Sequence, residues 1–128
     1  GLVIAGSGSK EKWLKEYAKY LGVYDRVKFI GWQSDVSSLY KTSELLLVTS
    51  LYEGYGLNMV ESVACGTPVV ATDVGVARDI GAIIVPYDAG QVARKVVETI
   101  NQNKIVELPQ KFILKKENYL ELFKRSFK

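Results

Sequence analysis

Short apolar runs alternate along this chain with segments whose apolar residues recur at helical spacing. The apolar runs predict strands over residues 2–5, 27–30, 45–49, 69–72 and 83–85. Residues 45–49 are apolar at almost every successive position, as expected for a strand that is covered on both faces. Strands that alternate with helices predict a Rossmann-like α/β fold, with a mostly parallel sheet and helices on both of its faces.

Segments of helical periodicity separate the strands. They predict helices over residues 10–21, 35–40, 57–65, 89–101 and 116–127. In the first of these helices, one face collects the side chains of Trp13, Leu14, Tyr17 and Leu21. Gly22 and Gly66 each follow a helix and are expected to be C-terminal caps. Ser34 is expected to cap the second helix, and residues 102–110 are expected to be a linker.

The overall composition excludes several classes of protein. A chain of 128 residues is expected to be one domain around a single core. It contains no histidine, which excludes Ser-His-Asp and Cys-His catalysis and the commoner zinc sites. No run approaches the roughly 18 apolar residues that a transmembrane helix needs. Cys65 has no partner for an internal disulfide, which fits a reducing compartment, and it is expected to be a small core residue.

The net charge of +3 is mild. It suits a phosphate-bearing ligand or an anionic membrane surface, and by itself it selects neither. A nucleic-acid partner is not expected, because the charge is small and no basic-aromatic surface motif is present. The basic C-terminal segment is interpreted as a solvated helix face or, alternatively, a membrane-surface contact; it carries Lys115, Lys116, Lys124, Arg125 and Lys128.

Ligands of parallel α/β sheets bind in the crevice beyond the carboxyl ends of the strands. In this chain those ends carry four short segments: Gly6-Ser7-Gly8, Gly31-Trp32, residues 50–56 and residues 73–75. Two alternatives stay open for the first two segments. The Gly6 segment fits a simple turn or a phosphate cradle, and Trp32 fits a ligand contact or a half-buried cap on the sheet.

The segment after the third predicted strand carries the strongest chemical signal. Gly54 and Gly56 bracket a turn, and the next helix begins at about Leu57. Free backbone N–H groups and the positive end of the helix dipole make that position suited to an anion. Glu53 precedes the turn and Glu61 follows it, so they are placed to reach two parts of one elongated ligand. Carboxylates suit the vicinal hydroxyls of a ribose or a hexose, although spacing alone also fits two solvated surface residues.

This segment resembles the signature of family 4 of the GT-B glycosyltransferases, the glycosyl transferases of group 1. The signature is two glutamates separated by seven residues, then a helix of small residues, and then Gly66-Thr67-Pro68-Val69. Residues 3–8, 27–31 and 111–127 are similar to further segments of the family, so the resemblance covers roughly the whole chain. It implies that residues 1–128 are the C-terminal, nucleotide-sugar-binding domain of such an enzyme.

The resemblance implies a role for each candidate residue. Glu61 would hold the ribose hydroxyls of the nucleotide, and Glu53, as the catalytic residue, would contact hydroxyls of the transferred sugar. The remaining substrate-binding residues fall into three groups. Gly54, Tyr55, Gly56 and Leu57 would lie near the sugar or the diphosphate. Gly6, Ser7 and Gly8 would lie beside the phosphates, and Gly31 and Trp32 beside the base.

The implied activity is retaining transfer of a hexose from a UDP-, GDP- or ADP-sugar to a glycan, lipid or small-molecule acceptor, as in polysaccharide biosynthesis. Catalysis would rest on positioning and on electrostatic stabilisation of an oxocarbenium-like centre and a departing diphosphate. No metal and no cofactor are expected. The expected location is the cytoplasm or the membrane surface that faces it.

The chain departs from the family pattern in two places. The family opens this domain with a further strand and helix, whose arginine and lysine neutralise the leaving diphosphate, and it has a separate N-terminal acceptor domain. Neither is found in this sequence, so the chain alone is expected to be an inactive part of a larger enzyme. The further strand would lie between residues 2–5 and 45–49, which predicts two unpaired strand edges that are prone to self-association. Residues 74–81 also lack the usual Gly-Gly and Pro-Glu, and Arg78 is expected in a surface ion pair rather than on a phosphate.

Two other functions are compatible with the sequence. Loss of the arginine and the lysine would leave a non-catalytic nucleotide-sugar-binding or regulatory module of the same fold. A different GT-B enzyme, an epimerase or a phosphorylase, is the other alternative, but a phosphorylase would need a pyridoxal-binding lysine motif that is not found here. The signature over residues 53–68 favours a glycosyltransferase.

Overall fold

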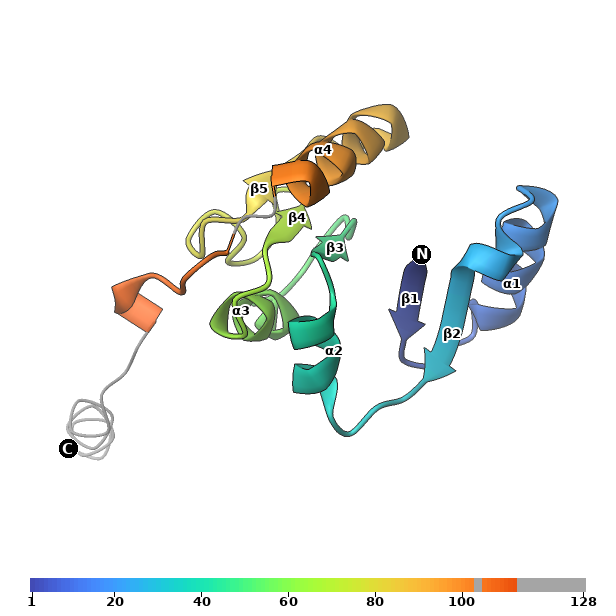
Figure 1. Ribbon diagram of the computed structural model, residues 1–128, viewed down its shortest axis with the longest axis horizontal. Coiled ribbons are helices and arrows are strands. Elements are labelled where there is room, and N and C mark those ends of the chain that lie inside the picture. Colours follow the sequence, from blue (N-terminus) through green and yellow to red (C-terminus); the bar gives the residue numbers. More distant parts are fainter. Residues whose placement is uncertain (103–104, 113–128) are drawn as a thin grey trace. The chain divides into compact units, whose positions relative to one another are not determined.

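The computed structural model describes residues 1–102 and 105–112. The chain divides into two compact units, the first over Gly1–Val36 and the second from Ser37 onward (Figure 1). Within the described residues, every α-helix and strand predicted from the sequence is present, with ends that differ by no more than two residues. The predicted helix over residues 116–127 and the basic C-terminal segment lie outside the described residues.

The first unit is a strand–helix–strand motif. Strand β1 (Leu2–Ala5) pairs in parallel with β2 (Val27–Gly31), so that Leu2 lies opposite Val27 and Ile4 opposite Phe29. Helix α1 (Glu11–Tyr20) and the 3₁₀ turn η1 (Tyr24–Arg26) connect the two strands (Figure 1). Parallel strands need such a crossover, because a tight turn only joins antiparallel neighbours.

Helix α1 ends in the way that the sequence predicts. Gly22 has a φ of 67°, and the amides of Gly22 and Val23 donate to the carbonyls of Lys19 and Ala18 at 2.9 Å each. These two bonds form a Schellman motif, which ends a helix at a left-handed glycine.

The apolar face of α1 is less buried than its sequence pattern suggests. Trp13 and Tyr17 stack at a ring distance of 5.1 Å but stay exposed, and Ala18 is the buried residue of α1.

The second unit contains a three-stranded parallel sheet. Its order is β3 (Leu46–Val48), β4 (Val69–Ala71) and β5 (Ile83–Ile84), with Leu46 opposite Val69. The helices of this unit are α2 (Val36–Thr42), α3 (Leu57–Ala64) and α4 (Ala89–Gln102). Because α2 begins at Val36, the residue that precedes it is Asp35 and not the expected cap, Ser34. None of the described helices has the length and apolar character needed to cross a membrane.

The mixed α/β class with parallel strands is confirmed. In the described part of the chain the strands form two sheets, β1-β2 and β3-β4-β5, and no ladder joins β1 to β3. Strands β1 and β3 therefore each have one edge without a strand partner among the described residues.

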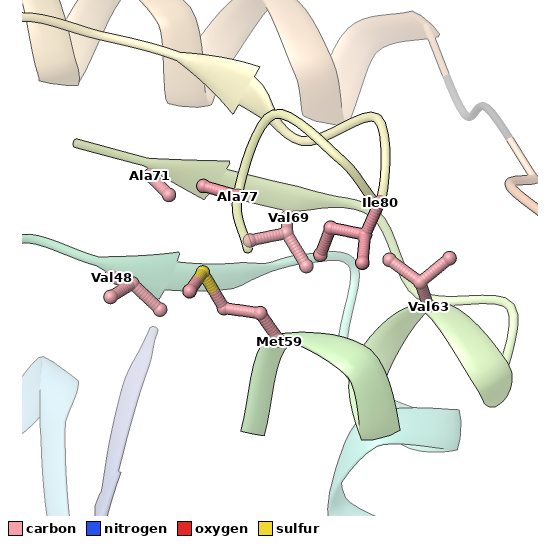
Figure 2. Packing of buried hydrophobic residues seen from close by; sticks show 7 residues of the cluster. All are labelled: Val48, Met59, Val63, Val69, Ala71, Ala77 and Ile80. Atoms are coloured by element: carbon pink, nitrogen blue, oxygen red, sulfur yellow. The ribbon is translucent and has the colours of Figure 1, made fainter. Parts of the chain in front are cut away.

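The core of the second unit lies between its sheet and α3. It consists of Val48, Met59, Val63, Val69, Ala71, Ala77 and Ile80 (Figure 2). The Met59 side chain points from the first half of α3 toward Val48 of β3 and is fully buried (Figure 2). Its burial holds the N-terminal end of α3 against the ends of the strands, and the candidate site lies at that end.

The linker predicted over residues 102–110 is wrong. Gln102 still belongs to α4, and Val106 and Leu108 pack against the core of the second unit together with Phe112 of the 3₁₀ turn η2 (Gln110–Phe112). These apolar residues are separated by polar ones, a spacing too irregular for a helix or strand pattern. Residues 105–112 are therefore part of the folded unit.

Candidate functional site

Two loops at the carboxyl ends of neighbouring strands form the candidate site in the second unit. The first loop, residues 49–56, joins β3 to α3, and the second begins at Thr72, directly after β4. The two strands lie side by side and run parallel, so both loops leave the sheet at the same edge. This edge carries Glu53, Gly54, Tyr55 and Gly56, as the sequence predicts.

Gly56 and Gly75 give these loops their shape. Gly56 is the N-cap of α3 in a left-handed conformation, with φ 86° and ψ 50°. Gly75, at φ 50°, packs so closely on the first loop that a Cβ there would lie 2.5 Å from the carbonyl oxygen of Tyr55. The amide of Val76 donates to the same oxygen at 2.9 Å. The second loop thereby supports the backbone that leads into α3.

Glu53 is held by a short relay of hydrogen bonds. The Ser50 hydroxyl donates to its Oε1 at 2.7 Å, and the Ser50 carbonyl accepts a bond of 2.5 Å from the hydroxyl of Thr72. Thr72 is buried at the end of β4 and its amide bonds to Val48 of β3 at 3.0 Å. The sheet thus fixes the carboxylate indirectly, and Glu53 is half-buried rather than a freely solvated loop residue.

Glu61 accepts a hydrogen bond from a neighbouring helix. The phenol of Tyr40 on α2 donates to its Oε2 at 3.2 Å. Burial, and secondly the charge of Glu61, raise the pKa of Tyr40 to about 12, so the phenol stays protonated at neutral pH. In the described residues neither Glu53 nor Glu61 is in an ion pair with a lysine or arginine. Both carboxylates therefore keep acceptor positions for a ligand.

The start of α3 has the features of an anion site. Its N-cap, Gly56, has no side chain to cap it, and its first turn contains no acidic residue. The Oδ1 of Asn58 accepts the amide of Met59 at 2.9 Å, but no negative charge in the first turn offsets the positive end of the helix dipole. Tyr55 and Leu57, which flank the N-cap, are 53% and 59% exposed, so a ligand has access to this backbone.

The other predicted residues belong to the first unit. There the structure brings the two predicted turns together, because the amide of Gly6 donates to the carbonyl of Gly31 at 2.6 Å. Both glycines have positive φ, 112° and 67°. Gly6 and Gly31 thus meet within the first unit, to which Ser7, Gly8 and Trp32 also belong, while Glu53 and Glu61 belong to the second unit. Trp32 is 75% exposed, so its interpretation as a half-buried cap on the sheet is wrong.

Two further predictions have clear outcomes. Arg78 forms a two-point ion pair with Asp73, at 2.8 Å from Nε and 2.7 Å from a terminal nitrogen, as the sequence favoured. Through this hydrogen bond and charge, Arg78 holds the pKa of Asp73 below its ordinary value. Cys65 is half-buried and outside the core cluster, which corrects the prediction of a core residue. Among the described residues, no cluster of three or more His, Cys, Asp or Glu side chains is arranged to hold a metal ion.

Sequence reasoning missed the residues that support the two glutamates. Tyr40 lies in a predicted helix and Thr72 closes a predicted strand, so each has an ordinary structural explanation, while Ser50 belongs to the segment 50–56 named above but was assigned no role. Only the contacts in the folded unit show that they surround the site.

Comparison with known proteins assigns the class and then the family. The structure is that of the GT-B glycosyltransferases, which it resembles over four-fifths of its length. The chain belongs to the family described as glycosyl transferases group 1, whose model matches residues 1–119.

The relatives in sequence are longer than this chain. It is 37% identical over 107 residues to D-inositol 3-phosphate glycosyltransferase of Mycolicibacterium smegmatis, covering 77% of this chain and 25% of that protein. It is 36% identical over 80 residues to the lipopolysaccharide core biosynthesis mannosyltransferase LpsB of Rhizobium meliloti, covering 59% and 23%. The chain thus spans about a quarter of these two relatives.

Solved structures of glycosyltransferases agree. Sucrose-phosphate synthase from Thermosynechococcus elongatus superposes with a TM-score of 0.71 at 26% identity, over 80% of this chain and 29% of that one. HepE from Anabaena, solved in complex with UDP, gives a TM-score of 0.66 at 26% identity, over 79% and 31%. HepE has also been solved with UDP-glucose.

Proposed function

We propose that this chain is the C-terminal, donor-binding domain of a retaining GT-B glycosyltransferase of family 4. The observation that carries the proposal is that two hydrogen-bonded carboxylates accompany the start of α3: Glu53 in the loop before the helix and Glu61 within it. An anion site together with two acceptors of hydroxyl groups matches a nucleoside diphosphate sugar, which has hydroxyls at both ends of a diphosphate. The UDP and UDP-glucose complexes of HepE support a UDP-sugar over GDP- and ADP-sugars.

Each part of the donor has a proposed partner. Glu61 accepts from the ribose hydroxyls, and Glu53, the proposed catalytic residue, accepts from hydroxyls of the hexose. The backbone of Gly54, Tyr55, Gly56 and Leu57 binds the diphosphate or the sugar at the start of α3. In the first unit, Gly6, Ser7 and Gly8 lie beside the phosphates, and Gly31 and Trp32 border the base.

The chemistry of this scheme needs no nucleophile from the protein. Fixed backbone dipoles at the start of α3 stabilise the charge that develops on the leaving diphosphate. Glu53 orients the hexose so that its anomeric carbon faces the acceptor, which lowers the entropic part of the barrier. The scheme uses no metal and no cofactor. The acceptor would bind to a further domain, and the enzyme would act in polysaccharide biosynthesis in the cytoplasm or at the membrane surface.

Nucleotide titrations followed by NMR test this proposal on the chain itself. UDP, GDP and ADP are each added to ¹⁵N-labelled protein, beside Glu61→Ala and a control, Glu44→Ala, which removes an exposed glutamate of the same unit. A half-site is expected to bind with a dissociation constant near the millimolar range, or about 4 kcal/mol, which NMR detects. UDP should shift the amides of Tyr55, Gly56 and Leu57 in wild type and Glu44→Ala, and Glu61→Ala should bind UDP about tenfold or more weakly.

Two results would contradict the proposal. One is a folded wild-type protein that binds none of the three nucleotides when each is present at several times the millimolar concentration expected for half-saturation. The other is binding that Glu61→Ala leaves unchanged, which would place the nucleotide elsewhere and leave a non-catalytic module as the better interpretation.

A further inference from the structure

Tyr40 contacts one of the two carboxylates of the candidate site from a different helix. We infer that Tyr40 is a positioning residue, which holds the Glu61 carboxylate in the orientation that accepts hydrogen bonds from the ribose hydroxyls. The inference rests on the proposed function, because it assigns Tyr40 a part in the same nucleotide site. Its geometric basis is the bond of 3.2 Å from the Tyr40 phenol on α2 to Oε2 of Glu61 on α3.

The backbone of Tyr40 is fixed to the same helix. Its carbonyl accepts a hydrogen bond of 2.7 Å from the hydroxyl of Thr67, which is only 4% exposed. Thr67 is joined in turn to Ser62, the residue next to Glu61, by two bonds: its amide donates to the Ser62 carbonyl at 3.0 Å, and its carbonyl accepts from the Ser62 hydroxyl at 3.1 Å. Tyr40 is therefore joined to α3 twice: its phenol bonds to Glu61, and its backbone bonds through Thr67 to Ser62, the next residue.

This arrangement limits the freedom of the Glu61 side chain. A glutamate on a helix surface has several rotamers, and a ligand that needs one of them must offset the entropy of selecting it. The Tyr40 bond selects one orientation before the ligand arrives. A carboxylate has about four acceptor positions, so one bond to Tyr40 leaves room for two ribose hydroxyls.

The inference predicts an effect that depends on the ribose hydroxyls. In Tyr40→Phe the ring and the Thr67 contact to the backbone stay, and only the phenol oxygen is lost. UDP binding should weaken about five- to tenfold, the size expected when the ligand must fix one further flexible side chain. Binding of 2′,3′-dideoxy-UDP should stay within twofold of the wild-type value, since this ligand lacks the hydroxyls that Glu61 accepts from.

The experiment is a double-mutant cycle with both ligands. Wild type, Tyr40→Phe, Glu61→Ala and the double variant are titrated with UDP and with 2′,3′-dideoxy-UDP. If Tyr40 acts through Glu61, Tyr40→Phe adds no further loss to Glu61→Ala. Tyr20→Phe is the matched control, because it removes the hydroxyl of a tyrosine that is 84% exposed on α1. It should bind both ligands like wild type.

The outcomes separate this inference from the proposed function. Equal weakening of both ligands by Tyr40→Phe, or no weakening of either, overturns the positioning role while nucleotide binding stands. A wild-type protein that binds neither ligand overturns both statements at once. The contact itself is then still tested without a ligand: the ¹³Cζ resonance of Tyr40 should titrate at lower pH in Glu61→Gln than in wild type, because the Glu61 charge contributes to the raised pKa of Tyr40.

Discussion

Gly75 lies directly against the carbonyl group of Tyr55, and the two loops of the candidate site meet at this point. A Cβ on residue 75 would lie 2.5 Å from the carbonyl oxygen and 2.9 Å from the carbonyl carbon of Tyr55. Both atoms belong to the backbone, so neither can rotate away. The contact fixes the loop just before the N-cap of α3, where the diphosphate is proposed to bind.

Gly75→Ala is therefore expected to be strongly destabilising. The substitution adds a Cβ at a φ of 50°, and it forces the two loops apart. Together these effects should lower the free energy of unfolding by about 2–4 kcal/mol. Urea denaturation followed by circular dichroism measures this quantity.

Gly54→Ala is the matched control for stability. A Cβ at Gly54 meets no atom within 4 Å, and its backbone lies outside the left-handed region. Its free energy of unfolding should stay within about 0.5 kcal/mol of wild type. If Gly75→Ala were as stable as Gly54→Ala, the close support of the Tyr55 backbone by the second loop would be refuted.

Met59→Ala tests the packing that holds α3 at the site. Met59 has no exposed surface and belongs to the core cluster with Val48 and Val63 (Figure 2). Its truncation leaves a cavity and should cost about 2–5 kcal/mol in urea denaturation. Met59→Leu keeps most of the volume and should cost less than about 1.5 kcal/mol. Equal losses in the two variants would show that the cavity is not the cause.

The sequence predicted the elements of this fold well because each strand and helix has a local pattern. The turn at Gly56 and the left-handed cap at Gly22 were predictable too, since glycine tolerates the φ that such positions need. The packing of Val106 and Leu108 on the core was not, because isolated apolar residues in an irregular segment have no period.

The residues of the candidate site were likewise predictable only in part. Glu53 and Glu61 became candidates because they flank a glycine turn and match the family signature, whereas their partners Ser50 and Tyr40 were assigned no role. Ser50 is close to Glu53 in the chain, but serine at the end of a strand is common. Tyr40 is 21 residues from Glu61, and only the packing of α2 on α3 brings the two together.

Ser50→Ala should weaken binding of the sugar part of the donor without weakening binding of the nucleotide part. It removes the 2.7 Å bond that orients Glu53, the residue proposed to contact the hexose. UDP-glucose must then fix the freed Glu53 side chain on binding, which should weaken its binding about fivefold and leave UDP binding unchanged. Ser43→Ala, which removes an exposed hydroxyl bonded to the Leu39 carbonyl, is the control. Isothermal titration or NMR titration with both ligands gives the comparison, and an equal loss for UDP would contradict the role of Glu53.

Stability at high pH should depend on Tyr40. Burial, together with the Glu61 charge, raises the pKa of Tyr40 from 10.0 to about 12 in the folded protein. The folded state then binds this proton more tightly than the unfolded state, so the contribution of Tyr40 to stability is complete below pH 10.0 and is lost as the pH rises through about 12. The measurement is the difference between wild type and Tyr40→Phe in urea denaturation at each pH, so that only the effect of Tyr40 is followed. The stability advantage of wild type should be constant up to about pH 9 and then shrink between pH 10.0 and about 12.

Tyr20→Phe, at an exposed position, should follow wild type at every pH. A difference between wild type and Tyr40→Phe that did not change with pH would mean that the phenol titrates alike in both states, and that neither its burial nor its contact with Glu61 is maintained in solution.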